Sequence, residues 1–388
     1  MMEKISLKYL LKIKNGRDHK NLNAGKIPVY GSGGIMRYVD TSIYNKESIL
    51  LPRKGTLNNI QYASQPFWCV DTIYYTEINQ SKVFPYFLYN YLKNLNLENL
   101  NTGTGVPSMT FDSYYNLKIN LPSLEAQQKI AKILSDIDDK IEVLHQINDN
   151  LAELAKTIYD YWFVQFDFPD ENGNPYKSSG GKMVYNEVLK REIPEGWEVK
   201  SLGEIEPNII TGKTPPTKDE NNFNGNILFI TIDDIRQNLF IYNSERTLSE
   251  KGANTQRAKF LKKGDICVSC IGTVGVIGIV GKIAQTNQQI NSISNPQNFN
   301  KYFLLNYLDR YFKDNFTAKK GAVLDNMNKA EFESIIIINP IQNIKEIYYG
   351  KVKFLYKKID TNIQQIQHLQ SLRDWLLPML MNEQVSVE

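Results

Sequence analysis

Residues 123–165 have the sequence SLEAQQKIAKILSDIDDKIEVLHQINDNLAELAKTIYDYWFVQ. Apolar side chains recur along it at spacings of three and four residues, the heptad pattern that predicts one long helix with an apolar seam. The seam positions are Ile130, Leu134, Ile137, Ile141, Leu144, Leu151, Ala155, Ile158 and Trp162, with Asn148 as the single polar residue. Ser123 can cap the first turn. Such a helix spans on the order of 60 Å, and its seam requires a partner helix.

A second long helix is predicted over residues 342–381. Its apolar positions are Ile344, Tyr348, Val352, Leu355, Ile359, Ile363, Ile366, Leu369, Leu372, Leu376 and Leu380. Acidic residues dominate the first helix and lysines dominate the second, so each helix should prefer the other to a copy of itself. The alternative is two amphipathic helices that pack separately on local cores.

Length and composition limit the class of protein. The 388 residues suffice for two or three domains. No run of about 18 apolar residues occurs, so we expect no contact with a membrane. Three cysteines and the lack of an export signal indicate the reducing cytoplasm. Because the net charge is only +3, binding to nucleic acid would have to come from local basic patches.

The chain contains an internal repeat. The segment YFLYNYL at residues 86–92 returns as YFLLNYL at residues 302–308, and Asn120-Leu121 returns as Ile338-Asn339 ahead of a proline in each case. The paired segments lie 216 to 218 positions apart. A separation this constant predicts two copies of one unit, each a β-rich domain followed by a long helix. Two similar units imply a pseudo-two-fold axis, which would place the helices antiparallel.

We therefore predict an α+β fold in which two β-rich domains are separated by two long antiparallel helices that form a coiled-coil spacer. The β-rich domains are expected at residues 1–122 and 196–340, where short strands alternate with turns. The helices are expected at residues 123–165 and 341–382. Residues 166–195 are rich in Pro, Gly, Ser and Asn, and this composition predicts a linker with little core of its own.

Candidate catalytic motifs are weak. Cys267 and Cys270 form a Cys-x-x-Cys pair within a glycine-rich β segment, whereas a redox pair needs a helix N-terminus and a zinc site needs four ligands. A structural role is the better interpretation. The run at residues 31–34 lacks the full G-x-G-x-x-G pattern, and no phosphate-binding loop motif occurs. Asn339-Pro340-Ile341 falls short of the Asn-Pro-Pro-aromatic motif of amino-methyltransferases. These observations predict a protein that is not an enzyme and holds no metal.

Polar and basic loops in matching places of both halves are the candidate DNA-binding sites. Arg, Lys and Asn can pair with base edges, while Ser, Thr and Lys can bind phosphates. The candidates are Tyr30, Ser32, Arg37, Arg53, Lys54, Thr56, Asn58 and Asn59 in the first half, and Lys213, Thr214, Thr217, Lys218, Arg236, Lys319 and Lys320 in the second. A duplicated domain with such loops suits DNA, because double-stranded DNA is itself a roughly two-fold ligand.

Several motifs together resemble the specificity subunits of type I restriction–modification systems, and the resemblance covers essentially the whole chain. They are LPSLEAQQKIAKIL at residues 121–134, IPEGWEV at 193–199, TGKTP at 211–215, NQQI at 287–290 and LRDWLLPML at 372–380. The first domain departs from the pattern, since it has no clear Pro-x-Gly-Trp opening.

This resemblance implies two target-recognition domains that each read half of a bipartite site in double-stranded DNA. It also implies that the helices act as a ruler and bind two DNA methyltransferase subunits, which bring S-adenosylmethionine. A restriction subunit, an ATP-dependent translocase and nuclease, would join them, and this chain itself would need no cofactor. Apolar residues off the seam are the candidate contacts with these partners: Ile133, Ile147, Leu154, Tyr159, Phe163, Ile363 and Leu372.

Three other classes of protein remain open. The first is an orphan DNA-recognition scaffold without a methyltransferase partner. The second is a structural coiled-coil adaptor whose β domains bind protein, and salt-dependent binding to duplex DNA would distinguish it. The third, a self-sufficient methyltransferase or nuclease, is disfavoured because the required motifs are absent.

Overall fold

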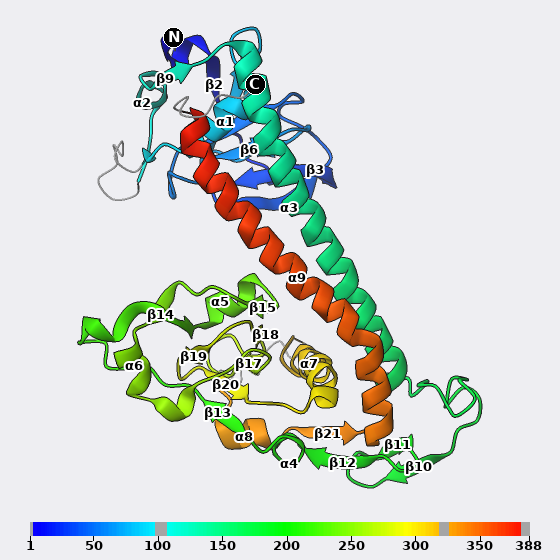
Figure 1. Cartoon of the computed structure of the whole chain (residues 1–388). Coiled ribbons are helices and arrows are strands. Elements are labelled where there is room, and N and C mark those ends of the chain that lie inside the picture. Colours follow the sequence, from blue (N-terminus) through cyan, green and yellow to red (C-terminus); the bar gives the residue numbers. More distant parts are fainter. Residues whose placement is uncertain (1–2, 98–106, 318–325, 382–388) are drawn as a thin grey trace. The chain divides into compact units, whose positions relative to one another are not determined.

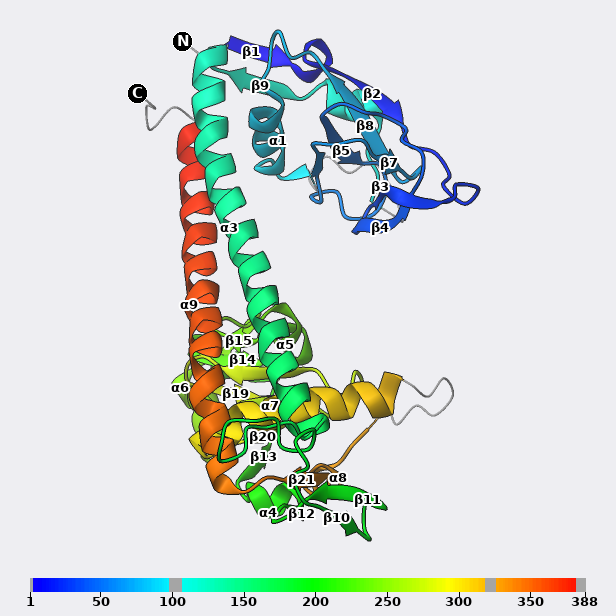
Figure 2. The same cartoon turned by 90° about the vertical axis from the view of Figure 1, so that its right-hand side faces the viewer.

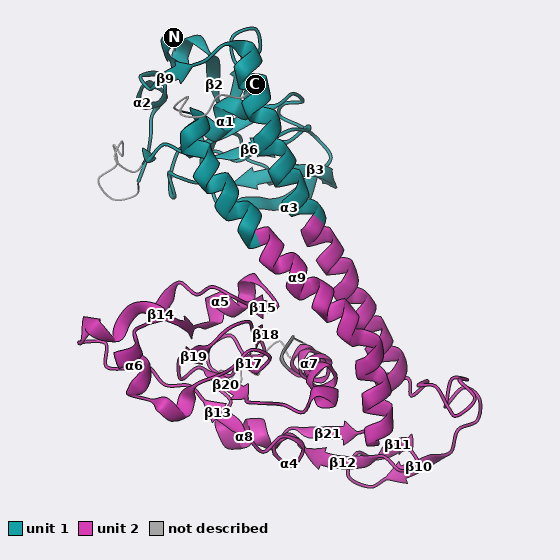
Figure 3. Ribbon diagram, viewed as in Figure 1, with its two compact units in different colours: residues 1–143, 367–388 teal, residues 144–366 magenta. Residues whose placement is uncertain are grey.

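A computed structural model describes residues 3–97, 107–317 and 326–381. The chain divides into two compact units (Figure 3). Unit 1 comprises residues 1–143 and 367–388, and unit 2 comprises residues 144–366. Each unit therefore combines a β-rich region with part of both long helices.

The two predicted long helices are present (Figure 1). Helix α3 covers Leu124–Tyr159 and continues as a π-helical turn at Asp160–Val164, and α9 covers Gln342–Met381. The Oγ atom of Ser123 accepts a hydrogen bond of 3.3 Å from the backbone N–H of Ala126, as the capping prediction requires. The sequence thus located both helices to within a few residues of their ends.

The helices pack against each other in both units, and in each unit they are antiparallel. In unit 2, the Nδ2 atom of Asn362 donates to the Oδ1 atom of Asn148 over 2.8 Å, while Trp162 contacts Tyr348 with ring centroids 5.8 Å apart. In unit 1, Arg373 forms an ion pair of 2.7 Å with Asp138. Residue numbers rise along α3 as they fall along α9. The alternative of separately packed helices is therefore wrong.

The described residues of unit 1 form a four-stranded sheet, a three-stranded sheet and one separate strand pair. Strand β5 is buried along its whole length and lies inside the larger sheet, as its continuous apolar run predicts. The sheets have the orders β2 (Leu11–Asn15), β8 (Ile73–Ile78), β5 (Ser48–Pro52), β6 (Gln61–Ala63), and β4 (Gly34–Val39), β3 (Ala24–Gly31), β7 (Trp68–Cys69). The separate pair is β1 (Glu3–Ser6) with β9 (Lys118–Leu121), and the helices are Leu7–Tyr9 (3₁₀), α1 (Pro85–Lys93) and α2 (Phe111–Tyr115).

Unit 2 is built in the same way, with a five-stranded sheet at its centre. Its sheets have the orders β13 (Ile209–Thr211), β20 (Ile290–Ile293), β17 (Ile266–Ser269), β18 (Ile277–Val280), β15 (Phe240–Ile241), and β16 (Arg246–Leu248), β14 (Phe223–Ile230), β19 (Ala284–Thr286). Two further pairs are β12 (Glu198–Ser201) with β21 (Ile336–Asn339), and β10 (Met183–Asn186) with β11 (Arg191–Pro194). Its helices are α4 (Leu202–Ile205), α5 (Ile232–Gln237), α6 (Glu250–Asn254), α7 (Asn298–Phe312) and α8 (Lys329–Glu333), with 3₁₀ turns at Glu220–Asn222 and Arg257–Lys259 and a π turn at Lys313–Thr317.

The YFLxNYL repeat has a direct structural meaning. In unit 1 this segment forms α1, whose Phe87, Leu88 and Leu92 enter a core shared with the first turns of α3 (Figure 2). In unit 2 the matching residues of α7 enter the core that includes Tyr348 and Val352 of α9. In both copies the central asparagine donates to the carbonyl four residues back, Asn90 to Tyr86 over 2.9 Å and Asn306 to Tyr302 over 2.7 Å, and Asn306 also donates to the hydroxyl of Tyr356 on α9 over 2.7 Å. The repeat therefore preserves the contact between a short helix and a long one.

The two copies differ by an insertion. The backbone N–H of Leu7 donates to Leu117, and that of Leu202 donates to Ile335, so Leu7 and Leu202 occupy equivalent places 195 positions apart. Ile49 and Ile266, on the central strands β5 and β17, are 217 positions apart. Unit 2 therefore has 22 more residues between these points, in the region that holds α5, α6 and the β14–β16 strands. The internal repeat is confirmed, with this difference in its first half.

The predicted linker is wrong in one respect. Residues 166–195 contribute Phe166, Phe168 and Ile193 to the core of unit 2, and their last part forms the β10–β11 hairpin. Phe168 stacks on Trp197 with ring centroids 5.0 Å apart. The Pro, Gly and Asn content of the segment describes its turns correctly but conceals three apolar residues that anchor it.

Candidate nucleic-acid interface

Both units place a glycine followed by a basic residue at the same point of the fold. In unit 1, the backbone N–H groups of Gly16 and Arg17 donate to the carbonyls of Ile73 and Cys69 over 3.1 and 2.9 Å. In unit 2, the N–H groups of Gly212 and Lys213 donate to the carbonyls of Ile290 and Thr286 over 3.0 and 2.9 Å. Since the hydrogen-bond pattern is the same, Arg17 is the structural counterpart of Lys213.

The glycine is required by the close approach of two backbones. A Cβ atom at Gly16 would lie within 3.0 Å of the carbonyl oxygen of Val70, and one at Gly212 within 3.0 Å of that of Asn287. Backbone atoms cannot give way there as a flexible side chain would, so only glycine fits. The basic residue that follows is thereby held against a neighbouring turn.

That neighbouring turn is the second of three loops that lie together in each unit. It consists of residues 70–72 in unit 1 and residues 287–289 in unit 2. In unit 2 it is lined by amides, because Asn287 donates to the Oε1 atom of Gln289 over 2.8 Å and Gln288 accepts from the hydroxyl of Thr214 over 2.7 Å. The amides thus fix one another and leave polar edges toward solvent.

A third loop completes the surface in each unit. The N–H of Arg53 donates to the carbonyl of Thr72 over 2.9 Å, and in unit 2 the N–H of Cys270 donates to that of Gln289 over 2.7 Å. Each loop then turns at a glycine with positive φ, Gly55 at 95° and Gly272 at 78°. We call the three loops together the three-loop surface: residues 16–20, 70–72 and 53–59 in unit 1, and residues 212–218, 287–289 and 270–276 in unit 2.

Several predicted DNA-binding side chains in unit 1 already hold loops together. Arg37 donates to the carbonyl of Leu22 over 2.6 Å, Asn59 donates to that of Ser32 over 2.5 Å, and Asn58 accepts from the N–H of Leu97 over 3.0 Å. A side chain engaged in this way supports the surface more than it offers free hydrogen-bonding groups. Tyr30 is half-buried and has an edge contact with Phe67, with ring centroids 6.1 Å apart.

The third loop of unit 1 offers the more accessible groups. Lys54 and Thr56 are exposed. Arg53 donates to the carbonyl of Asp71 over 3.2 Å, and its guanidinium lies 5.9 Å from the ring centroid of Tyr74. The arginine is therefore oriented along the second turn with donors to spare.

In unit 2, Lys213, Thr217 and Lys218 are exposed on the first loop. Arg236 stands at the end of α5 and forms an ion pair of 2.7 Å with Asp233 and a hydrogen bond of 2.5 Å to the hydroxyl of Thr273. This second contact joins α5 to the third loop. The predicted candidates Lys319 and Lys320 lie outside the described residues.

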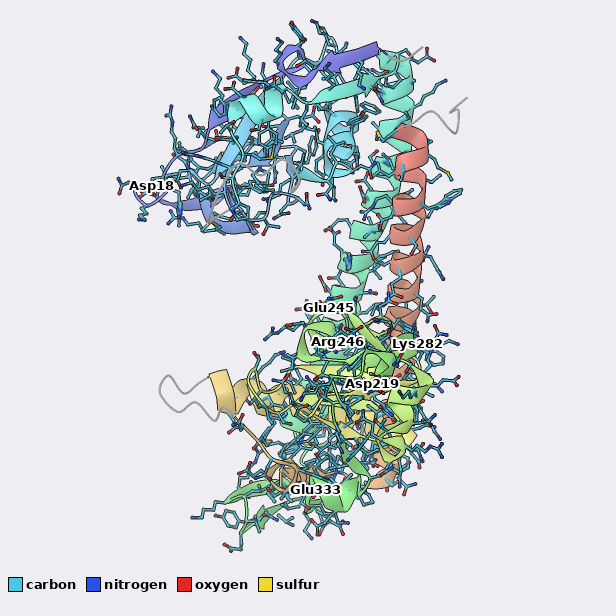
Figure 4. All side chains as sticks on the ribbon, turned by 90° about the vertical axis from the view of Figure 1, so that its left-hand side faces the viewer. Asp18, Asp219, Glu245, Arg246, Lys282 and Glu333 are labelled. Carbon is cyan, nitrogen blue, oxygen red and sulfur yellow. The ribbon has the colours of Figure 1, made fainter. Side chains whose placement is uncertain are left out.

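The sequence prediction missed the first loop of unit 1. Residues 18–20 and 31–33, together with Met36 and residues 70–72, line a cavity of about 600 Å³ beside Arg17. Asp18 lies at the margin of unit 1, away from α3 and α9 (Figure 4). Alignment of Asn15-Gly16-Arg17 with Thr211-Gly212-Lys213 would have identified this loop, but the separation of 196 positions differs from the 216 to 218 of the other repeats. The insertion in unit 2 lies after this segment and accounts for the different separation.

The predicted partner-binding residues divide into two groups. Ile147, Leu154 and Leu372 are exposed by 36%, 47% and 42%, and Ile133 is half-buried. The prediction that Tyr159, Phe163 and Ile363 contact a partner is wrong, because all three are buried in the core of unit 2. Phe163, for example, contacts Phe303 and Tyr348 with ring centroids 4.9 Å away in both cases. These apolar side chains are already buried within the chain and need no partner to cover them.

Other apolar side chains on the helices are also exposed. They are Val143 and Trp375 in unit 1, exposed by 46% and 57%, and Phe354 in unit 2, exposed by 65%. Full burial of a large apolar side chain is favourable by roughly 1.5–3 kcal/mol of free energy over leaving it in water. Val143 and Trp375 therefore mark a helix face of unit 1 that a further protein could cover.

The cysteines have the properties of structural residues. Cys267 and Cys270 lie on or directly after β17 and are buried, and burial raises the pKa of their thiols to about 12 and about 11. In the part of the chain that the structure describes, no group of three or more His, Cys, Asp or Glu side chains could hold a metal ion. No helix within the same residues is both long enough and apolar enough to cross a membrane.

Comparisons with known proteins agree with this architecture. The family model for the type I restriction modification DNA specificity domain matches residues 1–153 and 194–371. The HindI type I restriction enzyme specificity subunit of Haemophilus influenzae is 33% identical over 72% of this chain and 71% of its own length. The MjaIX specificity subunit of Methanocaldococcus jannaschii is 28% identical over 89% of this chain and 79% of its own.

A solved structure shares the fold. The crystal structure of a type I restriction–modification S subunit from M. genitalium aligns with 98% of this chain and 96% of its own, with a TM-score of 0.60 and 18% sequence identity. The two matched regions of the family model correspond to the two copies of the internal repeat.

Proposed function

Because the chain belongs to the family of type I restriction–modification specificity subunits, we propose that units 1 and 2 each read one half of a bipartite DNA site through the three-loop surface. As a member of this family the chain is a DNA-recognition subunit and not an enzyme, and it acts with DNA and with other subunits of a restriction–modification system. Family membership also favours DNA binding over the coiled-coil adaptor considered above.

The observation that carries the proposal is the equivalence of the two surfaces. Arg17 and Lys213 emerge from the same backbone position, behind a glycine that no other residue could replace. The side chains around them differ, with Asp18, His19 and Asp71 in unit 1 against Thr214, Gln288 and Gln289 in unit 2. A shared frame with different donors and acceptors suits two half-sites of different sequence.

The charge of the chain is consistent with DNA recognition by the basic and polar side chains of these loops. The chain carries a net charge of only +3, so attraction to DNA has to come from these loops. Lysine and arginine side chains there can bind phosphates and the O6 and N7 atoms of guanine, while the amides of unit 2 can pair with adenine.

We further propose that two methyltransferase subunits bind the exposed apolar faces of α3 and α9, and that a restriction subunit joins this complex. The proposal is supported by exposed apolar side chains on both helices: Ile147 and Leu154 in unit 2, and Leu372 and Trp375 in unit 1. S-adenosylmethionine and ATP would then belong to those partners, with no cofactor in this chain. The length of the helices would set the spacing between half-sites. The cytoplasm remains the expected compartment.

Exchange of one recognition domain tests the proposal. Residues 196–340 would be replaced by the matching segment of a relative with a different target, and the methylated sequence would be mapped in cells that carry the partner methyltransferase. One half of the methylated site should change while the other half and the spacer stay as they were. A change in both halves, or in neither, would contradict the assignment of one half-site to each unit.

A further inference from the structure

Unit 2 has a basic and aromatic cavity between α7, α9 and the end of β18, and we propose that it binds a nucleotide through its phosphate groups, either a free nucleotide or a nucleotide of a DNA strand. The cavity has a volume of about 440 Å³, within the usual range for small-molecule sites. None of the described residues that line it belongs to the three-loop surface, so the proposal goes beyond half-site recognition.

Four lysines line the cavity: Lys263, Lys301, Lys353 and Lys357. Among the described residues that line it, the only carboxylate is that of Asp360, which forms an ion pair of 3.1 Å with Lys263 and accepts from Gln364 over 3.1 Å. In the described part of the chain, Lys301, Lys353 and Lys357 have no ion-pair partner. The cavity therefore carries an uncompensated positive charge.

Lys301 lies beside the turn at Gly264. It belongs to the first turn of α7 and is half-buried. A Cβ atom at Gly264 would lie only 2.6 Å from the Nζ atom of Lys301, so the glycine leaves room for the ammonium group. Burial lowers the pKa of its ammonium group, while Asp265 acts in the opposite direction. Asp265 itself accepts hydrogen bonds from the backbone of Lys262 and Asn295. An anion in the cavity would supply Lys301 with the partner it lacks.

The walls of the cavity are aromatic. Tyr302 stacks on Tyr356 and on Tyr349, with ring centroids 4.0 and 5.6 Å apart, so Tyr349 and the exposed Phe354 are the rings left for a ligand. Phe354 is 65% exposed, and the ammonium group of Lys353 lies 4.9 Å from its ring centroid. Flat apolar surfaces beside cations suit a ligand that combines a flat ring with negative charge. Lysine binds phosphate as a point charge, and bases stack on aromatic side chains.

The internal repeat shows that the fold does not need a lysine at position 357 or an aromatic residue at position 354. Unit 1 has the same contact of a short helix with a long one, with Tyr86 in the place of Tyr302. At the positions of Phe354 and Lys357, 218 residues earlier, unit 1 has Asp136 and Asp139. The same scaffold thus tolerates acids where unit 2 has a basic and aromatic lining. This difference indicates a function specific to unit 2.

The test uses the full-length chain and a fluorescent ADP analogue followed by fluorescence anisotropy. The analogue should bind, inorganic tripolyphosphate should displace it, and rising salt should weaken it. The double variant Lys353→Ala/Lys357→Ala should bind at least tenfold more weakly, since two charged contacts are lost. The matched control Lys351→Ala/Lys358→Ala removes the same charge from exposed positions of α9 outside the cavity and should bind as the unaltered chain does.

The outcomes separate the two sources of the nucleotide. Binding of the analogue supports a free nucleotide, whereas binding of a single-stranded oligonucleotide alone, again lost in Lys353→Ala/Lys357→Ala, supports a DNA strand. The proposal is overturned if neither probe binds, if both double variants bind equally, or if polyglutamate competes as well as tripolyphosphate. Thermal unfolding of both variants checks that each is folded. The methylated sequence should be unchanged in both, which distinguishes this site from the three-loop surface.

Discussion

The hydrogen bond between Asn148 and Asn362 gives a quantitative prediction about the helix pair. Asn362 is fully buried, Asn148 is half-buried, and the Nδ2 atom of Asn362 donates to Asn148 over 2.8 Å. The Oδ1 atom of Asn362 has no partner among the described residues. The substitution Asn148→Leu would remove the acceptor and leave a buried amide with no hydrogen bond, at a cost of about 1–3 kcal/mol.

The reverse substitution should be milder. With Asn362→Leu, the half-exposed Asn148 can turn to water, so the cost should stay below about 1 kcal/mol. The double variant leaves no stranded amide and should be close to neutral or slightly stabilising. It would also lose the polar pair that fixes the register of the seam.

Hydrogen exchange measures this locally, which suits a chain with two units. Backbone amides of α9 around Asn362 should exchange roughly 5- to 150-fold faster in Asn148→Leu than in the unaltered chain. In Asn148→Leu/Asn362→Leu the exchange should return to about its original rate. If the double variant exchanges as fast as Asn148→Leu, the stranded amide is not the cause and the reasoning is refuted.

Three further predictions concern spacing, partners and thiols. Insertion of one heptad after Val143 and one after Ile366 lengthens both helices by about 10.5 Å and should widen the unspecified spacer of the methylated site by up to about three base pairs; an unchanged spacer would show that the helices are not a ruler. Leu154→Glu or Leu372→Glu should abolish co-purification with methyltransferase subunits, whereas His145→Glu on α3 should not, and retention of the partner by both leucine variants would exclude this face. Because Cys69, Cys267 and Cys270 are buried with raised pKa values, a thiol reagent at neutral pH should modify the native chain on the order of a hundredfold more slowly than the unfolded chain; equal rates would contradict their burial.

The long helices were predictable because their signal is periodic and local. Seam positions such as Leu134 and Val352 are buried as the heptad pattern requires. The same periodicity could not separate core from surface off the seam. Phe163 and Leu154 look alike in sequence, yet Phe163 is covered by Trp197 and Phe303 while Leu154 is 47% exposed. That distinction depends on segments far away in the chain.

The recognition surface was predictable only in part. Polar composition identified the loop around Lys213 and the loop around Arg53, but it could not show which side chains are occupied. Arg37 and Asn59 appear free in sequence and are in fact bonded to the carbonyls of Leu22 and Ser32. Arg17 was missed because its equivalence with Lys213 rests on backbone hydrogen bonds and not on similar neighbours.

Methylation mapping of two single variants tests the central claim most directly. Arg17→Ala and Lys213→Ala would each be expressed with the partner methyltransferase, with Lys282→Ala as a control on an exposed turn of unit 2. A lost base contact reduces discrimination by about 1–3 kcal/mol, so each variant should relax the methylated sequence in one half-site, and the two variants should affect opposite halves. The control should leave the site unchanged. If both variants altered the same half, or neither altered the sequence, the two units would not read separate half-sites through the three-loop surface.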